Sequence, residues 1–212
     1  QWMAQMSHQR EISEFVQRLK KLLSYNLGKE GRKTTLRMEL ELVKEYIALQ
    51  QMRYDFIIEM NIEDGSYLDQ PTVRMLFQPL VENAIRYGLG DDEKISIQVF
   101  EDVARHLAVV TISDSGKGLN QEEIDEINQP FDYDWGYWKN ENRGIGLRYV
   151  KAMLESFYDG QTSLFVNSKK GFGTRITILL PVRKPEEKKE KDKEVTLEEN
   201  KVGQTDESID CR

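Results

Sequence analysis

The stretch "FQPLVENAIRYG" combines polar side chains that could hold a metal ion and a phosphorylated ligand. Asn83, Arg86 and Tyr87 bring a carboxamide, a guanidinium and a phenol within about one helical turn, and such groups suit a metal ion and phosphate oxygens. On a helical wheel they lie opposite an apolar arc that runs from Phe77 to Ile85. An ordinary helix with one solvated polar face is the alternative interpretation of this stretch.

A second stretch, "TISDSGKGL", ends a β-branched strand at Asp114 and continues directly into Gly116 and Gly118. Glycines let a backbone approach a flat ligand closely, and a carboxylate accepts a hydrogen bond from an exocyclic amine. Asp-Ser-Gly is also common in tight turns that bind nothing. The motif alone therefore leaves both a binding site and a plain turn open.

Two further stretches place glycines at the start of a secondary-structure element. In "RGIGLRYV", Gly144 and Gly146 stand where a helix should begin, and the free N–H groups of a helix N-terminus can hold phosphate. In "GFGTRITILLP", two glycines and Thr174 precede a strand. Each stretch is weak by itself, but the order of all four along the chain is informative.

Hydrophobic periodicity predicts the elements that must position these residues. We expect helices at 12–27, 36–52, 71–87 and 144–158, the third of them kinked at Pro79 and capped by Asp69. We expect strands at 56–63, 94–102, 106–114, 162–168 and 174–181. Residues 119–142 lack a clear period, which indicates a long functional loop with at most one short helix.

Composition limits the classes of protein that this chain can represent. The net charge is −7 and the pI about 5.1, which argues against a nucleic-acid partner. The single cysteine, Cys211, excludes a disulfide within the chain, and no run of apolar residues approaches the length of a membrane span. Residues 184–212 have too little apolar surface to offset their ordering entropy, so we expect a disordered tail.

The four motifs in this order resemble the ATP-binding domain of the GHKL superfamily, which is shared by histidine kinases, type II topoisomerases, mismatch-repair ATPases and a heat-shock chaperone. The similarity is closest to LytS/YesM-like sensor histidine kinases, on "LRMELELVKEYIALQQMRYDFIIEMNIE" followed by "QPLVENAIRYG", and it covers about residues 36–181. It implies an α/β two-layer sandwich of the Bergerat type, in which helices cover one face of a mixed, mainly antiparallel sheet. Residues 1–53 would be the remnant of a dimerisation region and 54–183 the catalytic domain.

The resemblance implies a site for ATP and Mg²⁺. Asn83 would coordinate the Mg²⁺ that bridges the phosphates, and Arg86 and Tyr87 would contact phosphate or ribose. Asp114 would recognise the adenine amine, with Thr174 close to adenine.

The same resemblance makes residues 119–142 the lid over the nucleotide. The remaining residues implied to lie at the nucleotide are Gly116 and Gly118 at the base, Lys139 and Arg143 as phosphate contacts, and Gly144, Gly146 and Leu147 at the start of the lid helix. Glu82 would polarise a group near the phosphates.

Two departures from the family pattern bear on activity. Hydrolysing members carry a glutamate four residues before the metal-binding asparagine, where this chain has Pro79, so phosphoryl transfer to a protein side chain is favoured over hydrolysis. The Asn-Pro-His-Phe motif that holds the acceptor histidine is absent, and "QWMAQ" resembles what directly follows it. We therefore expect a fragment that begins just after the acceptor. His8 lacks the neighbours of that motif and is not assigned as the acceptor.

The sequence is therefore interpreted as the cytoplasmic kinase core of a bacterial membrane sensor. Its implied partners are a response regulator, a second copy in a homodimer of the full-length protein, and an upstream membrane sensor region. Two alternatives stay open, namely a GHKL-type ATPase that drives conformational change and a non-catalytic module in which nucleotide orders the lid. Phosphate transfer to an acceptor helix supplied in trans would separate them.

Overall fold

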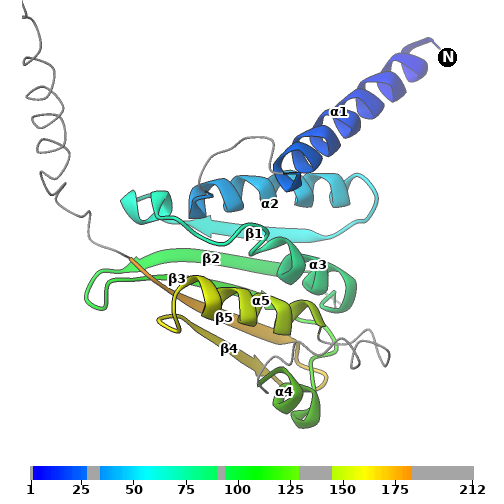
Figure 1. Ribbon diagram of the computed structural model, residues 1–212. Helices are drawn as coiled ribbons and strands as arrows, with labels where there is room; N and C mark the ends of the chain where they lie inside the picture. The colour runs from blue at the N-terminus through cyan, green and yellow to red at the C-terminus, as the bar shows by residue number, and fades with distance from the viewer. Residues whose placement is uncertain (1, 28–33, 90–93, 129–144, 183–212) are drawn as a thin grey trace, which may run out of the picture. The chain divides into compact units, whose positions relative to one another are not determined.

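Alternating apolar residues in the central strands bury one face of a five-stranded sheet (Figure 1). The structure is a computed structural model that describes residues 2–27, 34–89, 94–128 and 145–182. Its helices are α1 (Trp2–Asn26), α2 (Leu36–Gln51), the short 3₁₀ helix η1 (Ser66–Asp69), α3 (Gln78–Tyr87), α4 (Gln121–Asn128) and α5 (Ile145–Phe157). Its strands are β1 (Ile57–Ile62), β2 (Lys94–Asp102), β3 (Leu107–Asp114), β4 (Ser163–Ser168) and β5 (Thr174–Pro181).

The strand order is β1-β2-β3-β5-β4, with β1 parallel to β2 and every other pair antiparallel. In β2 the side chains of Ile95, Ile97 and Val99 are buried, while those between them are more exposed. This period of two is what a sheet covered on one face requires. The predicted α/β class with a mixed, mainly antiparallel sheet is confirmed.

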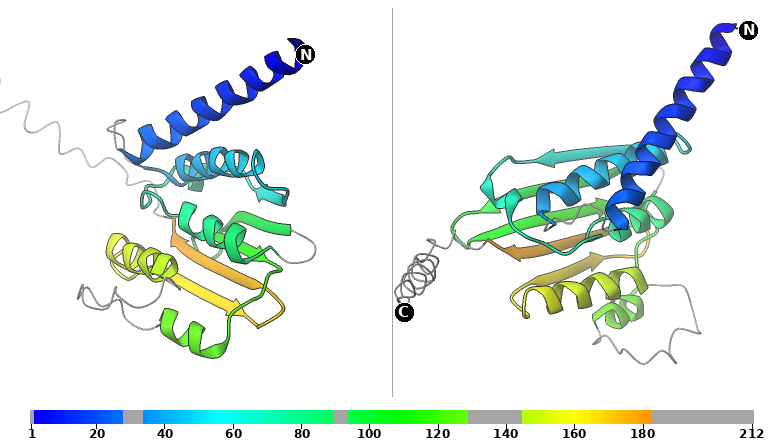
Figure 2. Two further views of the ribbon diagram at one scale, coloured as in Figure 1. Left: turned by 90° about the vertical axis from the view of Figure 1, so that its right-hand side faces the viewer. Right: turned by 45° about the horizontal axis from the view of Figure 1, so that its top comes forward.

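Three helices cover the apolar face of the sheet, and α2, α3 and α5 lie over it together (Figures 1 and 2). The side chains of Leu40 and Val43 from α2, Leu80 from α3 and Leu154 from α5 share one buried cluster with the inward residues of the strands. A separate small cluster joins the end of α1 to the outer side of α2. In the described part of the chain, no helix combines the length and the apolar character needed to cross a membrane.

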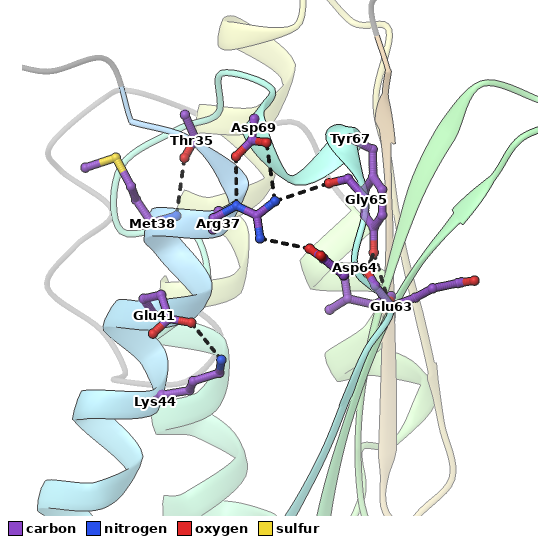
Figure 3. Close-up of polar contacts among 11 residues, drawn as sticks. Thr35, Arg37, Met38, Glu41, Lys44, Glu63, Asp64, Gly65, Tyr67 and Asp69 are labelled. Carbon is purple, nitrogen blue, oxygen red and sulfur yellow. Dashed lines mark hydrogen bonds and ion pairs between the residues drawn. The ribbon is translucent and has the colours of Figure 1, made fainter.

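The start of α2 is fixed by polar contacts with the segment after β1 (Figure 3). Thr35 caps the helix, because its hydroxyl accepts a hydrogen bond from the backbone N–H of Met38. The Arg37 guanidinium donates to Asp69 at 2.8 Å and to Asp64 at 3.0 Å. The bond from Arg37 lowers the pKa of the Asp69 carboxyl. Asp69 therefore contacts α2, and it is not the cap of the helix that we predicted to follow it.

The third predicted helix is wrong at its start. It begins at Gln78, not near residue 71, and Pro79 lies in its first turn without a kink. A proline suits the first turn, where its missing N–H has no helical partner to lose. The preceding segment turns at Met75, whose φ of 60° is incompatible with a helix.

The other predicted elements agree with the structure apart from small shifts at their ends, except that α1 begins ten residues earlier, at Trp2. The one short helix expected after residue 119 is α4. Asn120 and Glu123 form a capping box at its start, each side chain accepting from the backbone N–H of the other residue at 2.9 and 2.8 Å. The remainder of the predicted loop and the predicted disordered tail lie outside the described residues.

Candidate functional site

A cavity of about 140 Å³ lies between α3, the end of β3, α4 and the start of α5. Its polar lining side chains are those of Asn83, Tyr87, Asp114, Lys117, Glu123 and Thr174. Apolar side chains supply much of the rest of the wall, namely Leu80, Ile112, Leu119, Ile127, Leu147 and Ile176. Pockets for drug-sized ligands usually measure about 300–1,000 Å³. The volume bounded by the described residues is smaller than that range.

Asp114 is the last residue of β3, and two backbone groups fix its carboxylate. The N–H groups of Gly116 and Thr174 both donate to Oδ1, each at 3.1 Å. Thr174 is the register partner of Asp114 across the β3–β5 pair, so the sheet itself sets this contact. Partial burial raises the pKa of Asp114, and the two hydrogen bonds oppose that rise. Both of these hydrogen bonds go to Oδ1.

Asn83 reaches the cavity because the opposite side of α3 is fixed in the core. Leu80, Val81 and Ala84 are buried against the sheet and the neighbouring helices, as the apolar arc predicted. A Cβ atom at Gly146 would lie 3.4 Å from Nδ2 of Asn83. The beginning of α5 therefore approaches the Asn83 side chain closely.

Two glycines of the Asp-x-Gly-x-Gly stretch are required by the backbone around the cavity. A Cβ at Gly116 would lie 2.5 Å from the carbonyl oxygen of Tyr87, at the end of α3. Gly118 has a φ of +61°, and a Cβ there would lie 2.2 Å from the carbonyl oxygen of Lys169. We predicted that these glycines admit a base, and the structure adds that they let three segments of the protein meet.

Seven of the predicted site residues line the cavity: Asn83, Tyr87, Asp114, Gly118, Gly146, Leu147 and Thr174. Gly116 lies behind the wall, in contact with the end of α3. Glu82 and Arg86 do not line the cavity, and they form an ion pair of 2.9 Å with each other on the surface of α3. Lys139, Arg143 and Gly144 lie outside the described residues.

Sequence reasoning did not select Lys117 and Glu123, which also line the cavity. The Lys117 ammonium lies 4.6 Å from the centre of the Tyr87 ring, a cation–π contact at the edge of the site. Lys117 occupies a variable position of the Asp-x-Gly-x-Gly stretch, and the flanking glycines alone do not indicate that it reaches the cavity. Glu123 and Ile127 are four residues apart on α4, a helical spacing that puts them on one face.

Comparison with protein families identifies the same regions. The family described as histidine kinase-, DNA gyrase B- and HSP90-like ATPase matches residues 68–184, and the family described as histidine kinase matches residues 1–57. The sensor protein kinase HptS of Staphylococcus aureus, strain bovine RF122 / ET3-1, is 30% identical over 168 residues. The match covers 79% of this chain and 32% of that protein, and the HptS of strain USA300 gives the same figures.

Two solved structures are similar at lower identity. The histidine kinase domain of the blue-light activated histidine kinase of Erythrobacter litoralis EL346 has a TM-score of 0.48 and 20% identity, covering 81% of this chain and 75% of that one. The Acinetobacter baumannii histidine kinase AdeS has a TM-score of 0.48 and 16% identity, and the match covers 86% of this chain and 84% of that one.

The chain belongs to the histidine kinase-, DNA gyrase B- and HSP90-like ATPase family, and the cavity lies within the matched region. The family match of residues 1–57 and the similarity to HptS both point to histidine kinases. The chain spans about a third of the length of the curated relatives that it matches.

Proposed function

We propose that the full-length protein transfers the γ-phosphoryl group of Mg-ATP to a histidine outside this chain, and from there to an aspartate of a response regulator. The observation that carries the proposal is that Asn83 of α3 and Asp114 of β3 line the same cavity, beside the start of α5. An amide that can bind a metal and a carboxylate that can accept an amine would then contact the same ligand.

Adenine is the part of ATP that fits the cavity. Its ring system would lie between the apolar side chains of Ile112, Leu147 and Ile176, and its exocyclic amine would donate to Oδ2 of Asp114. Because Oδ1 is already held by two backbone N–H groups, the carboxylate is oriented before the ligand arrives. Ribose and phosphates would then extend along α3 past Tyr87 and Lys117.

The donor chemistry of the site fits Mg²⁺. Mg²⁺ is usually bound by one or two protein oxygens together with substrate phosphates and water. The described residues contain no cluster of three or more His, Cys, Asp or Glu side chains able to hold a metal, so the Asn83 amide oxygen would be joined mainly by phosphate and water. When bound, the ion would neutralise charge on the phosphates.

The chemical step is an in-line displacement at the γ-phosphorus. A bond forms from an imidazole nitrogen to phosphorus while the bond to the β–γ bridging oxygen breaks, so that ADP leaves and the ring loses a proton. Pro79 stands where hydrolysing members have a glutamate, which supports transfer over hydrolysis. We propose Glu82 as a polarising group, which would require its carboxylate to leave Arg86.

The exposed side of α1 supports self-association of the region within residues 1–53. Apolar side chains recur along it at helical spacing with 38% to 62% exposure: Ile12, Phe15, Val16, Leu19 and Leu23. A continuous apolar stripe of this kind marks an interaction surface. We propose that two copies pair along it, in a protein whose sensor region is membrane-bound and whose kinase core is cytoplasmic.

The test supplies the acceptor in trans. The chain is mixed with ATP labelled at the γ-phosphate and with the separately produced segment that carries the acceptor histidine. We expect an acid-labile, base-stable label on that segment. The label should be weaker with Asp114→Asn at low ATP concentration, and absent with an acceptor in which Gln replaces the histidine. Label that appears only as inorganic phosphate would support the ATPase alternative, and bound but intact ATP would support the non-catalytic module.

A further inference from the structure

Glu39 of α2 is a fully buried carboxylate that plays no part in the chemistry described above. Its exposed fraction is 0%. Oε1 accepts from the Tyr25 hydroxyl at 2.5 Å and from the Met75 N–H at 2.8 Å, and Oε2 accepts from the Leu76 N–H at 2.7 Å. Burial raises the pKa of Glu39, and the hydrogen bonds partly offset that rise. An isolated carboxylate is expensive to bury, so these contacts hold it in place.

The two backbone groups that Glu39 binds stand directly before α3. The residue at the N-cap position of this helix, Phe77, makes no capping hydrogen bond through its side chain. Glu39 supplies a negative charge there from a different helix, where the helix dipole favours an anion. It also holds Met75 in its left-handed conformation, which a non-glycine residue rarely adopts. Glu39 therefore contacts the segment that leads into α3, the helix that carries Asn83.

The third partner of Glu39 belongs to the last part of α1. Tyr25 is 5% exposed, and the Arg74 guanidinium lies 5.0 Å from the centre of its ring in a cation–π contact. Arg74 in turn donates to the backbone carbonyl of Tyr25 at 2.8 Å. Residues 74–76 are therefore tied to the end of α1 by two independent contacts, one through Glu39 and one through Arg74.

We propose that Glu39 is a positioning residue that couples the end of α1 to the start of α3, so that a displacement of α1 alters the nucleotide site. The inference rests on the proposed nucleotide site and adds a physical connection to it. The connection is short and buried, and it runs from Tyr25 through Glu39 to the backbone of Met75 and Leu76, two residues before α3. Its effect on the nucleotide is indirect, because Glu39 does not line the cavity.

Two substitutions separate the parts of this connection. Tyr25→Phe removes the hydroxyl and keeps the ring under Arg74. Glu39→Gln replaces one of the two acceptor oxygens with an NH₂ donor. If the NH₂ group takes the place of Oε2, it meets the Leu76 N–H. If it takes the place of Oε1, it meets the Met75 N–H and the Tyr25 hydroxyl. Tyr67→Phe is the matched control, because Tyr67 is also buried and its hydroxyl contacts the backbone carbonyls of Glu63 and Val99, away from α3.

The first measurement is amide hydrogen exchange without nucleotide. We expect Tyr25→Phe and Glu39→Gln to speed exchange at Leu76, Leu80 and Val81, and Tyr67→Phe to leave these amides at the wild-type rate while lowering stability. The second is calorimetric titration with Mg²⁺ and a non-hydrolysable ATP analogue, at a temperature where every variant is folded. Coupling of this kind typically changes affinity by about 2- to 30-fold, and we expect losses in that range for both variants.

The double variant completes the test. Because both residues act through one connection, we expect its loss of affinity to be smaller than the product of the two single losses. Unchanged exchange at the start of α3 in Tyr25→Phe, or wild-type affinity in both folded single variants, would overturn the coupling. A wild-type chain that binds no nucleotide would instead overturn the proposed site, and with it the effect of the coupling on ligand binding.

Discussion

The backbone N–H of Thr174 donates to Oδ1 of Asp114 at 3.1 Å, across a register pair of β3 and β5. Gly116 donates to the same oxygen. These two bonds fix one carboxylate oxygen of Asp114, and we propose that the other oxygen binds the ligand. Because the two oxygens have separate tasks, a substitution can alter one task and keep the other.

Asp114→Asn should remove ligand recognition without removing the structural bonds. The Asn Oδ1 can still accept from Gly116 and Thr174, while an NH₂ donor replaces the acceptor that faces the adenine amine. A hydrogen bond to a charged group contributes about 1.5–3 kcal/mol, so we expect affinity for an ATP analogue to fall about 10- to 100-fold. Calorimetry gives the affinity, and an unchanged affinity would show that Asp114 does not bind the base.

Asp114→Asn should weaken ligand binding but stabilise the fold at neutral pH, because the pKa of Asp114 is raised. A carboxyl whose pKa is higher in the folded state contributes stability that is present at low pH and is lost as pH rises through the folded-state pKa. We therefore expect Asp114→Asn to increase the free energy of unfolding at pH 7 and to lose this advantage toward pH 4. Urea denaturation at several pH values measures it, and a destabilised variant at pH 7 would contradict the burial argument.

Ligand affinity should show the reverse pH dependence. The ionised Asp114 carboxylate is the form that accepts the adenine amine, so affinity should fall as the pH decreases. Because the pKa of Asp114 is raised, the fall should begin at a higher pH than for an exposed aspartate, whose pKa is about 3.9. Titrations of the wild-type chain from pH 7 downward test this, with Asp114→Asn as the variant that lacks the group.

Gly118→Ala should be more damaging than a matched change at Gly160. Both glycines have a positive φ, which costs a residue with a Cβ about 1–2 kcal/mol. Nothing lies within 4 Å of a Cβ at Gly160, whereas at Gly118 the Lys169 carbonyl oxygen would be 2.2 Å away. We expect Gly160→Ala to lower the free energy of unfolding only by the cost of its positive φ. Gly118→Ala should lower the free energy of unfolding by more, and should also weaken nucleotide binding. Equal losses in denaturant titrations would mean that the contact with Lys169 is unimportant.

The apolar stripe on α1 should govern self-association. Val16→Asp places a charge in the stripe, which should weaken the dimer by at least about 1.4 kcal/mol, or tenfold in Kd. Analytical ultracentrifugation measures this Kd. Gln17→Ala, at an exposed position on the side of the helix away from the stripe, should leave association unchanged. A chain that is monomeric at all concentrations would count against pairing through α1 alone.

The strands could be predicted from sequence because their alternation reports directly which face is buried. β2 and β5 have the predicted bounds, and β1, β3 and β4 differ from them only at their ends. The residues of the site that lie within short motifs, such as Asn83 and Asp114, were also identifiable, since each motif combines its residue types within a few positions.

The start of α3 could not be predicted in this way, because the segment before it is bound by a residue distant in sequence. Glu39 binds the N–H groups of Met75 and Leu76 from another helix, and no local pattern in residues 71–77 reports this. Lys117 and Glu123 were missed for a related reason. Their membership of the site follows from the way the β3–α4 connection folds back against α3, which is a tertiary property.

Calorimetric titration of a non-hydrolysable ATP analogue, with and without Mg²⁺, tests the nucleotide site most directly. It is performed on the wild-type chain and on Asn83→Ala, whose side chain points to the cavity and not to the core. We expect binding that Mg²⁺ strengthens in the wild type, and an Asn83→Ala variant that is folded, binds more weakly and has lost most of the Mg²⁺ effect. Equal affinity and equal Mg²⁺ dependence in the two proteins would contradict the assignment of Asn83, and no binding by the wild type would contradict the site itself.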